Sequence, residues 1–189
     1  MAEMMDVIKK RRSVRSFRDK KVSEDLIHKI IESACYAPSG INFQPWRFVS
    51  VTDPDVRDDF AQKALIYAWP FIERIKKEFP ERYKMLRKSF ETLQDPVFFH
   101  APAIIFIIGT GKLSEIPCTF AAENCMLAAA SLGLGTCWSD LGVLVSKDPK
   151  SSKLLELKKD EKLVAAVAVG YEEVETPAIP RKSTDISWI

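Results

Sequence analysis

Three arginines lie close together near the start of the chain, within residues 11–17 (Arg-Arg-Ser-Val-Arg-Ser-Phe). The cluster contains Arg11, Arg12, Ser13 and Arg15. Arginine suits phosphate because its planar set of N–H donors meets two oxygens at once. The cluster therefore indicates a phosphate-binding site. The same pattern on its own is also typical of a basic surface turn or a nucleic-acid contact.

A second polar stretch follows at residues 37–46 (Ala-Pro-Ser-Gly-Ile-Asn-Phe-Gln-Pro-Trp). Its prolines restrict the backbone, its glycine permits close approach, and its Asn and Gln side chains carry amide donors and acceptors. Pro, Ser, Gly and Asn also fill ordinary turns. A phosphate site combined with an amide-rich loop favours a flat, phosphorylated cofactor with polar edges over a polymer.

Together the two stretches resemble the FMN-dependent nitroreductase family. Its members open with Arg-[Arg/His]-Ser-x-[Arg/Lys]-x-Phe and continue with Ala-Pro-Ser-[Gly/Ser]-x-Asn-x-Gln-Pro-Trp. The resemblance continues through residues 133–138, ends near Pro180-Arg181-Lys182 and is weakest between residues 60 and 99. It implies bound FMN and an α+β fold, in which helices surround a mixed, largely antiparallel sheet. It also implies an intertwined homodimer with two FMN sites at the interface.

The resemblance implies a role for each basic residue. Arg11 and Ser13 hold the FMN phosphate together with Arg181, and Arg12 belongs to the same cofactor-binding cluster. Arg15 faces the N1/O2 edge of the isoalloxazine ring. A fixed cation there stabilises the negative charge of the reduced ring and raises its reduction potential.

The resemblance also places two further groups at the flavin. The first group contacts the FMN of the neighbouring subunit and consists of Pro38, Ser39, Gly40 and Asn42. The second lies beside the N5 edge and consists of Trp138, Ser139 and Asp140. Many relatives carry glycines just after the Trp, so it stays open whether the Ser139 hydroxyl or a backbone N–H meets N5. No side-chain acid or base is obligatory, because flavin N5 carries the chemistry and solvent can deliver protons.

The composition fits a single domain spanning residues 1–189. The net charge of +2 is too small to indicate nucleic acid or a membrane surface, and no apolar run approaches the ~20 residues of a membrane helix. Early charges at Glu3, Asp6 and Lys9 argue against a signal peptide, so we expect a cytoplasmic protein. The four cysteines and two histidines lack zinc-type spacing, and we expect no metal site.

The periodicity of apolar residues predicts helices and strands that do not alternate strictly, which favours an α+β fold. Helices are predicted over residues 4–8, 24–37, 56–93 (interrupted by Pro70 and Pro80) and 119–132. Strands are predicted over residues 48–51, 103–108 and 164–169, the last two fully buried. Ser23 is a predicted N-cap, and the small residues of 119–132 predict a helix at the centre of the packing.

Residues Tyr67 to Asp95 are the least family-like part of the chain and allow two interpretations. In one, they form a surface helical pair whose aromatic side chains cover the core. In the other, the helical excursion over residues 60–99 forms a lid over the flavin and sets substrate choice. Deiodinase-like relatives use a Glu-x-x-x-Tyr pair here to hold an amino-acid substrate, and this chain has no such pair.

The resemblance therefore predicts an FMN-dependent oxidoreductase. Hydride passes from NAD(P)H through flavin N5 to an oxidised acceptor such as a nitroaromatic or a quinone, in two alternating half-reactions. Three alternatives remain: a flavin-dependent reductive dehalogenase or a specialised flavin-consuming enzyme of the same fold, a non-catalytic flavin-binding or ligand-sensing protein, and a basic nucleic-acid module built on the arginine cluster. The sequence leaves open both the acceptor and the choice between NADH and NADPH.

Overall fold

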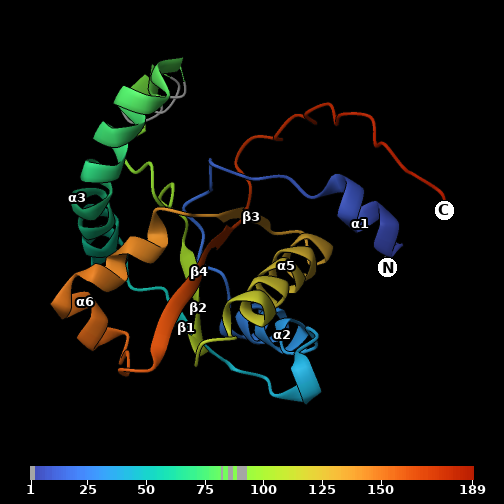
Figure 1. The fold of residues 1–189 in the computed structure, drawn as a ribbon, viewed down its shortest axis with the longest axis horizontal. Coiled ribbons are helices and arrows are strands. Elements are labelled where there is room, and N and C mark those ends of the chain that lie inside the picture. Colours follow the sequence, from blue (N-terminus) through green and yellow to red (C-terminus); the bar gives the residue numbers. More distant parts are fainter. Residues whose placement is uncertain (1–2, 82, 85–86, 89–92) are drawn as a thin grey trace.

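The computed structural model describes residues 3–81, 83–84, 87–88 and 93–189 (Figure 1). Its helices and 3-10 turns are α1 (Met4–Lys10), α2 (Glu24–Ala34), η1 (Gly40–Asn42), α3 (Pro54–Glu78), α5 (Glu115–Ser131), η2 (Gly142–Lys147) and α6 (Pro149–Leu154). Its strands are β1 (Trp46–Val51), β2 (Ala103–Thr110), β3 (Gly135–Trp138) and β4 (Glu161–Gly170).

The four strands form one antiparallel sheet in the order β1-β2-β4-β3. β2 and β4 occupy the centre, where Ile105 lies opposite Val167, and this confirms the prediction of two fully buried strands. Within the described residues the only parallel pairing is an isolated bridge between Ser13 and Thr136. The predicted α+β fold with a largely antiparallel sheet and surrounding helices is therefore confirmed.

Helices cover both faces of the sheet, each over its own part of the core. α2 and α5 pack on one face, and α3 with η2 packs on the other (Figure 1). The small side chains of α5, such as Ala121 and Cys125, are fully buried against α2 and the sheet. This placement confirms the predicted central helix, because small residues let neighbouring elements approach closely.

Local signals set the ends of α2. The Ser23 hydroxyl accepts a hydrogen bond from Leu26 N at 3.4 Å, and Glu24 and Asp25 place negative charge in the first turn. α2 ends at Ala34, a few residues before the predicted limit at Pro38, because residues 35–37 turn to begin the next loop. The predicted cap is therefore confirmed, and the predicted end was a little late.

α3 differs from its prediction in two respects. It continues unbroken through Pro70, because the buried side chains of Ala68 and Ile72 anchor the turns on either side of the proline. Three aromatic side chains that would cover the core in one of the two interpretations are instead about half exposed: Trp69, Phe71 and Phe79. In Figure 1 this end of α3 projects beyond the sheet, so these side chains lie outside the core. Phe90, predicted in the same group, lies outside the described residues.

The C-terminal segment leaves the sheet after β4. Phe17 and Glu172 form an isolated bridge, and Glu173 N donates to Ser16 O at 3.1 Å. Residues 177–189 are exposed throughout and carry the bulky side chains of Ile186 and Trp188 on the surface. In Figure 1 this segment passes α1 and ends away from the sheet.

Candidate cofactor site

The arginine cluster lies along the edge strand β3, which the sequence did not predict. Val14 N donates to Thr136 O at 2.9 Å, beside the parallel bridge that joins Ser13 to Thr136. A Cβ at Gly135 would lie only 2.8 Å from Val14 Cγ2. Glycine at this position therefore allows the segment after α1 to approach the strand, with the Val14 side chain buried between them.

A cavity of about 260 Å³ opens where this segment meets the C-terminal end of α5. We call it the basic pocket; its lining includes Lys10, Arg11, Arg12, Gly135, Thr136 and Glu172. Three cations against one carboxylate give the pocket an excess of positive charge. Arg11 also lies 3.8 Å from Glu123 of α5, measured from Nε to Oε1, a distance that leaves the guanidinium free to bind another anion.

Arg12 is held differently from Arg11 and Ser13. The Arg12 guanidinium donates to Lys9 O at 2.6 Å and to Arg11 O at 2.9 Å, so it satisfies carbonyl groups at the end of α1. Ser13 is half-buried on β3. Of the predicted phosphate residues in this cluster, Arg11 and Ser13 therefore have the freer side chains.

Arg15 projects to the exposed side of the cluster. Its Nη1 donates to Ser13 O at 3.2 Å, and its guanidinium carbon lies 5.7 Å from the centroid of the Phe99 ring. Burial raises the pKa of the nearby Cys137 thiol, while Arg15 and Arg11 oppose that rise and Asp140 adds to it. Both guanidinium groups and the Asp140 carboxylate therefore gather around the end of β3.

Residues 138–140 leave β3 in a tight turn. Trp138 Nε1 donates to Asp140 Oδ1 at 2.7 Å, and Ser139 N donates to Ala166 O at 2.9 Å. The buried Ser139 Oγ accepts a hydrogen bond from Gly142 N at 3.0 Å. Because this oxygen acts as an acceptor, the Ser139 hydroxyl retains a proton that it can donate to another group.

The second predicted stretch forms a strained loop. Ser39 Oγ accepts from Gln44 N at 3.0 Å, which closes the loop on itself. Three non-glycine residues have left-handed backbones: Ile41 (φ 47°), Asn42 (φ 58°) and Gln44 (φ 48°). A β-branched residue rarely adopts this conformation, and Ile41 does so with its side chain 99% exposed. Strain of this kind concentrates at functional sites.

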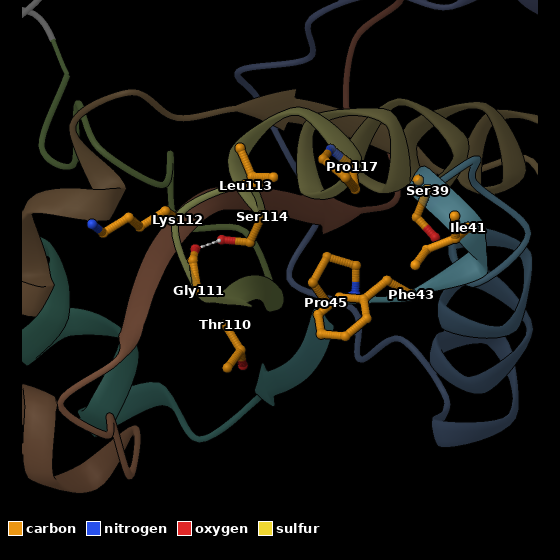
Figure 2. Close-up of a pocket in the computed structure, with 11 residues that line it drawn as sticks. Ser39, Ile41, Phe43, Pro45, Thr110, Gly111, Lys112, Leu113, Ser114 and Pro117 are labelled. Atoms are coloured by element: carbon orange, nitrogen blue, oxygen red, sulfur yellow. Dashed lines mark hydrogen bonds between the residues drawn. The ribbon is translucent and has the colours of Figure 1, made fainter.

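A second cavity, of about 450 Å³, separates this loop from the residues that join β2 to α5. We call it the apolar pocket; Figure 2 shows Ile41, Phe43, Pro45, Leu113 and Pro117 among the residues around it. Its floor is fixed by the bond from Ser114 Oγ to Gly111 O at 2.8 Å. The two pockets therefore differ in chemistry as well as in place.

The two predicted halves of the site do not meet within one chain. The apolar pocket lies at the start of α5, which begins at Glu115, and the basic pocket lies at its end, near Ser131. At a rise of 1.5 Å per residue these ends are about 24 Å apart. In Figure 1 the light-blue segment that contains η1 and the helix α1 lie on opposite sides of α5.

Arg181 stands apart from the cluster it was predicted to join. It lies in the exposed C-terminal segment, and it is not among the described residues that line the basic pocket. Two lining residues were missed as site residues: Gly135, signalled by its glycine-rich context, and Thr136, whose buried Oγ1 has no hydrogen-bond partner among the described residues. Such a hydroxyl is short of one partner, which a polar ligand oxygen can supply after a side-chain rotation.

The donor set of the basic pocket fits the phosphate of FMN. Arg11 supplies charged donors, Lys10 adds a second cation, and Thr136 supplies a hydroxyl group; Ser13, bridged to Thr136, carries a second hydroxyl next to the pocket. The exit of β3, with Trp138 and Ser139, offers polar and aromatic groups next to this pocket. None of the described residues that line the basic pocket comes from the loop of residues 37–46.

The described part of the chain contains side chains of the kinds that ligate metals, and buried thiols. Over the described ranges, no three His, Cys, Asp or Glu side chains are grouped so as to hold a metal ion. Burial raises the pKa of Cys118 to about 11 and that of Cys125 to about 12, so both thiols stay protonated near neutral pH. No helix in the described part of the chain has both the length and the apolar character needed to cross a membrane.

Comparisons of sequence identify a family and two relatives. The model of the nitroreductase family matches residues 8–171. A putative NADH dehydrogenase/NAD(P)H nitroreductase of Archaeoglobus fulgidus is 29% identical over 185 residues, covering 93% of this chain and 88% of that protein. An iodotyrosine deiodinase of Thermotoga neapolitana is 28% identical over 192 residues, covering 100% of this chain and 98% of that protein.

Comparisons of structure agree on the fold. A nitroreductase with bound FMN from Bacteroides fragilis superposes with a TM-score of 0.76 at 25% identity, covering 100% of both chains. A nitroreductase with bound FMN from Desulfitobacterium hafniense gives a TM-score of 0.82 at 23% identity, covering 100% of this chain and 99% of that one.

Proposed function

The chain belongs to the nitroreductase family, and we propose that it is an FMN-dependent oxidoreductase that oxidises NADH or NADPH and reduces a small acceptor such as a nitroaromatic or a quinone. The observation that carries the proposal is the basic pocket, which Arg11 and Thr136 line, with Ser13 bridged to Thr136 at the edge of the sheet. This arrangement suits a molecule with a phosphate at one end and a polar ring system at the other.

The phosphate is held, in this proposal, by Arg11 and Ser13 with help from Lys10. Arg181 completes the phosphate clamp from the C-terminal segment. Residues 177–189 of this segment are exposed, so they can move toward the phosphate without breaking buried contacts. Arg12 contributes indirectly, because its bonds to Lys9 O and Arg11 O fix the end of α1 from which the cluster starts.

Arg15, Trp138 and Asp140 would hold the ring system beyond the end of β3. The chemistry that bound FMN supplies is two-electron transfer, with hydride passing from NADH or NADPH to N5 and from N5 to the acceptor. Arg15 places a fixed positive charge at the N1/O2 edge, and either the Ser139 hydroxyl or a backbone N–H of this turn donates to N5. Both substrates need the same open ring face, so they bind in turn.

The second part of each site comes from a partner subunit. The loop of residues 37–46 contributes Ser39 and Gly40 to the apolar pocket at the start of α5, whereas the basic pocket of the same chain lies at the other end of that helix, about 24 Å along its axis. Large apolar side chains are exposed over α1, this loop and the outer face of α5: Met4, Met5, Ile8, Tyr36, Ile41, Phe43, Ile116 and Phe120. An exposed apolar surface of this extent is typical of an obligate homodimer.

The outer end of α3 is the proposed lid. Trp69, Phe71 and Phe79 are exposed at the end of a helix that projects beyond the sheet. Aromatic side chains held there can cover a ring-shaped acceptor, and their identity would then determine which acceptors enter.

The proposal is tested by the flavin spectrum of the purified protein and by anaerobic titration with NADH and NADPH. We expect a yellow protein whose flavin absorbance bleaches with one or both nicotinamides and returns when a quinone or nitroaromatic is added. A colourless protein that does not bind added FMN would overturn the cofactor assignment. A yellow protein that neither nicotinamide bleaches would be a flavin-binding protein without this activity.

Reductive dehalogenation is the second candidate, favoured by the iodotyrosine deiodinase relative that this chain matches over its full length. It is opposed by the lack of a Glu-x-x-x-Tyr pair between Tyr67 and Asp95. Iodide release from 3-iodotyrosine and from 2-iodophenol by the chemically reduced protein separates the two. We expect little release from 3-iodotyrosine, and rapid release from it would favour the dehalogenase.

A further inference from the structure

We propose that Phe99 and Asp95 are positioning residues for Arg15, and that they fix the guanidinium at the edge of the flavin on which the proposed function depends. The inference rests on that function and deepens it. It assigns a role to the strained turn of residues 95–100, just before β2. This turn belongs neither to the arginine cluster nor to the loop of residues 37–46.

The Phe99 ring is the main support of an otherwise exposed side chain. Within the described part of the chain, the Arg15 guanidinium makes two contacts: it lies over the Phe99 ring at 5.7 Å and donates to Ser13 O at 3.2 Å. An arginine over an aromatic face is held by its cation–π attraction, while its in-plane N–H groups stay free for other acceptors. Arg15 is therefore ordered and still has donors for a ligand.

The Phe99 ring is itself fixed from below. It packs on a small core cluster formed by Val14, Phe17, Ala101, Cys137 and Ala168. Val14 and Cys137 belong to the arginine cluster and to β3, so the ring rests on the same elements that form the basic pocket. The Phe99 ring therefore holds Arg15 in a fixed position relative to β3.

The backbone at Phe99 adopts a strained conformation. Phe99 and His100 both have left-handed backbones, with φ of 60° and 53°. Two successive non-glycine residues in this region are strained, and such strain persists only where the surroundings impose it. The strained pair turns the chain so that the ring faces the arginine cluster.

Asp95 imposes this turn. Its buried carboxylate accepts three backbone hydrogen bonds: from Val97 N at 2.9 Å, from Phe98 N at 2.9 Å and from His100 N at 3.0 Å. Asp95 O also accepts from Phe99 N at 3.2 Å. The Asp95 carboxylate therefore binds the N–H groups of the residues before and after Phe99. Through the Phe99 ring, it connects the end of the helical excursion to Arg15.

The test compares the FMN-loaded variants Phe99→Leu, Phe99→Tyr, Asp95→Asn and Arg15→Gln. Leu keeps an apolar side chain but removes the ring face, whereas Tyr restores the ring. The matched control is Tyr171→Leu, which removes a different cation–π pair, with Lys20 Nζ 4.0 Å from the ring centroid. The readouts are flavin midpoint potential, FMN affinity and thermal stability. The double variant Arg15→Gln/Phe99→Leu measures whether the two side chains act together.

We expect Phe99→Leu to lower the flavin potential in the same direction as Arg15→Gln and by less, with FMN affinity nearly unchanged. Asp95→Asn should act in the same direction, while Phe99→Tyr and Tyr171→Leu should keep the wild-type potential. In the Arg15→Gln background, Phe99→Leu should cause no further fall.

Two results overturn the inference while the proposed function stands. One is a wild-type potential in Phe99→Leu although Arg15→Gln is lowered. The other is an equal fall from Phe99→Leu with and without Arg15, which would mean that the ring acts independently. A wild-type protein that binds no FMN would instead overturn the proposed function, and this inference with it.

Discussion

The two ends of α5 carry pockets of opposite character. At its C-terminal end the chain closes the basic pocket with its own backbone, by pairing Val14 with Thr136 across Gly135. At its N-terminal end the strained loop leaves the apolar pocket open, with the Ile41 side chain almost fully exposed. One end is completed within the chain, and the other presents groups to something outside it.

The space around two glycines shows this difference between the two ends. A Cβ at Gly135 would collide with Val14, whereas a Cβ at Gly40 would meet no atom within 4 Å. A side chain added at residue 135 must therefore disturb its own subunit. A side chain added at residue 40 can disturb only a molecule that approaches from outside, such as a partner's flavin.

Gly135→Ala should have the largest effect. The added Cβ would lie 2.8 Å from Val14 Cγ2, and overpacking of this kind costs about 1–3 kcal/mol. It should push the arginine cluster off β3, so both the melting temperature and FMN occupancy should fall. Gly40→Ala is the matched control and should leave the melting temperature unchanged. Full occupancy and wild-type stability in Gly135→Ala would contradict the seating of the cluster on β3.

Arg11→Ala and Arg181→Ala should each weaken FMN binding and leave the fold intact. Loss of one charge-assisted contact to phosphate costs about 1.5–3 kcal/mol, or roughly 10- to 100-fold in Kd. Lys182→Ala removes a neighbouring charge from the same exposed segment and should change the Kd much less. If Arg181→Ala kept wild-type affinity and occupancy, the C-terminal segment would have no part in the phosphate clamp.

Arg15→Gln should change the reduction potential of the flavin more than it changes FMN binding. The phosphate contacts remain, so much of the FMN should stay bound, but the charge opposite the reduced ring is lost. The flavin potential should fall by a few tens of millivolts, since about 30 mV corresponds to about 1.4 kcal/mol for two electrons. Spectroelectrochemistry of the loaded variant measures this shift. An unchanged potential would move Arg15 away from the ring edge.

Glu161→Gln should lower the free energy of unfolding at neutral pH and leave FMN affinity unchanged. Hydrogen bonding by Arg47 lowers the pKa of Glu161 from 4.5 to about 2, through contacts of 2.9 and 2.8 Å. A lowered pKa in the folded state means that this carboxylate stabilises the fold above about pH 4.5 and loses that effect as the pH falls toward 2. The stability difference between wild type and variant should therefore shrink over that interval. A constant difference would contradict the role of the ion pair.

Elements with strong local signals were predictable. Ser23 and the two acidic residues after it mark the start of α2, and the apolar run of β2 marks a central strand because both of its faces are buried. β3 was missed because its four residues carry no strand pattern of their own. It becomes a strand only through long-range pairing with β4 and with the arginine cluster.

The candidate site was predictable in its parts and not in its assembly. Residue types indicated that the arginine cluster suits a phosphate, and the family resemblance assigned that role to Arg11 and Ser13. Neither the collision at Gly135 nor the ring of Phe99 under Arg15 follows from spacing, because both depend on contacts between segments far apart in the chain. The same holds for Pro70, where packing on both sides outweighs the usual tendency of proline to break a helix.

The central claim, that each FMN site combines the basic pocket of one subunit with the loop of the other, is tested most directly with a mixed dimer. One subunit carries Arg11→Ala and the other Gly40→Trp, with different tags so that the heterodimer can be purified. Each homodimer should bind FMN weakly, whereas the heterodimer should have about one wild-type site per dimer, because both defects fall in the other site. A heterodimer with no tight FMN site would show that each site is built from a single chain.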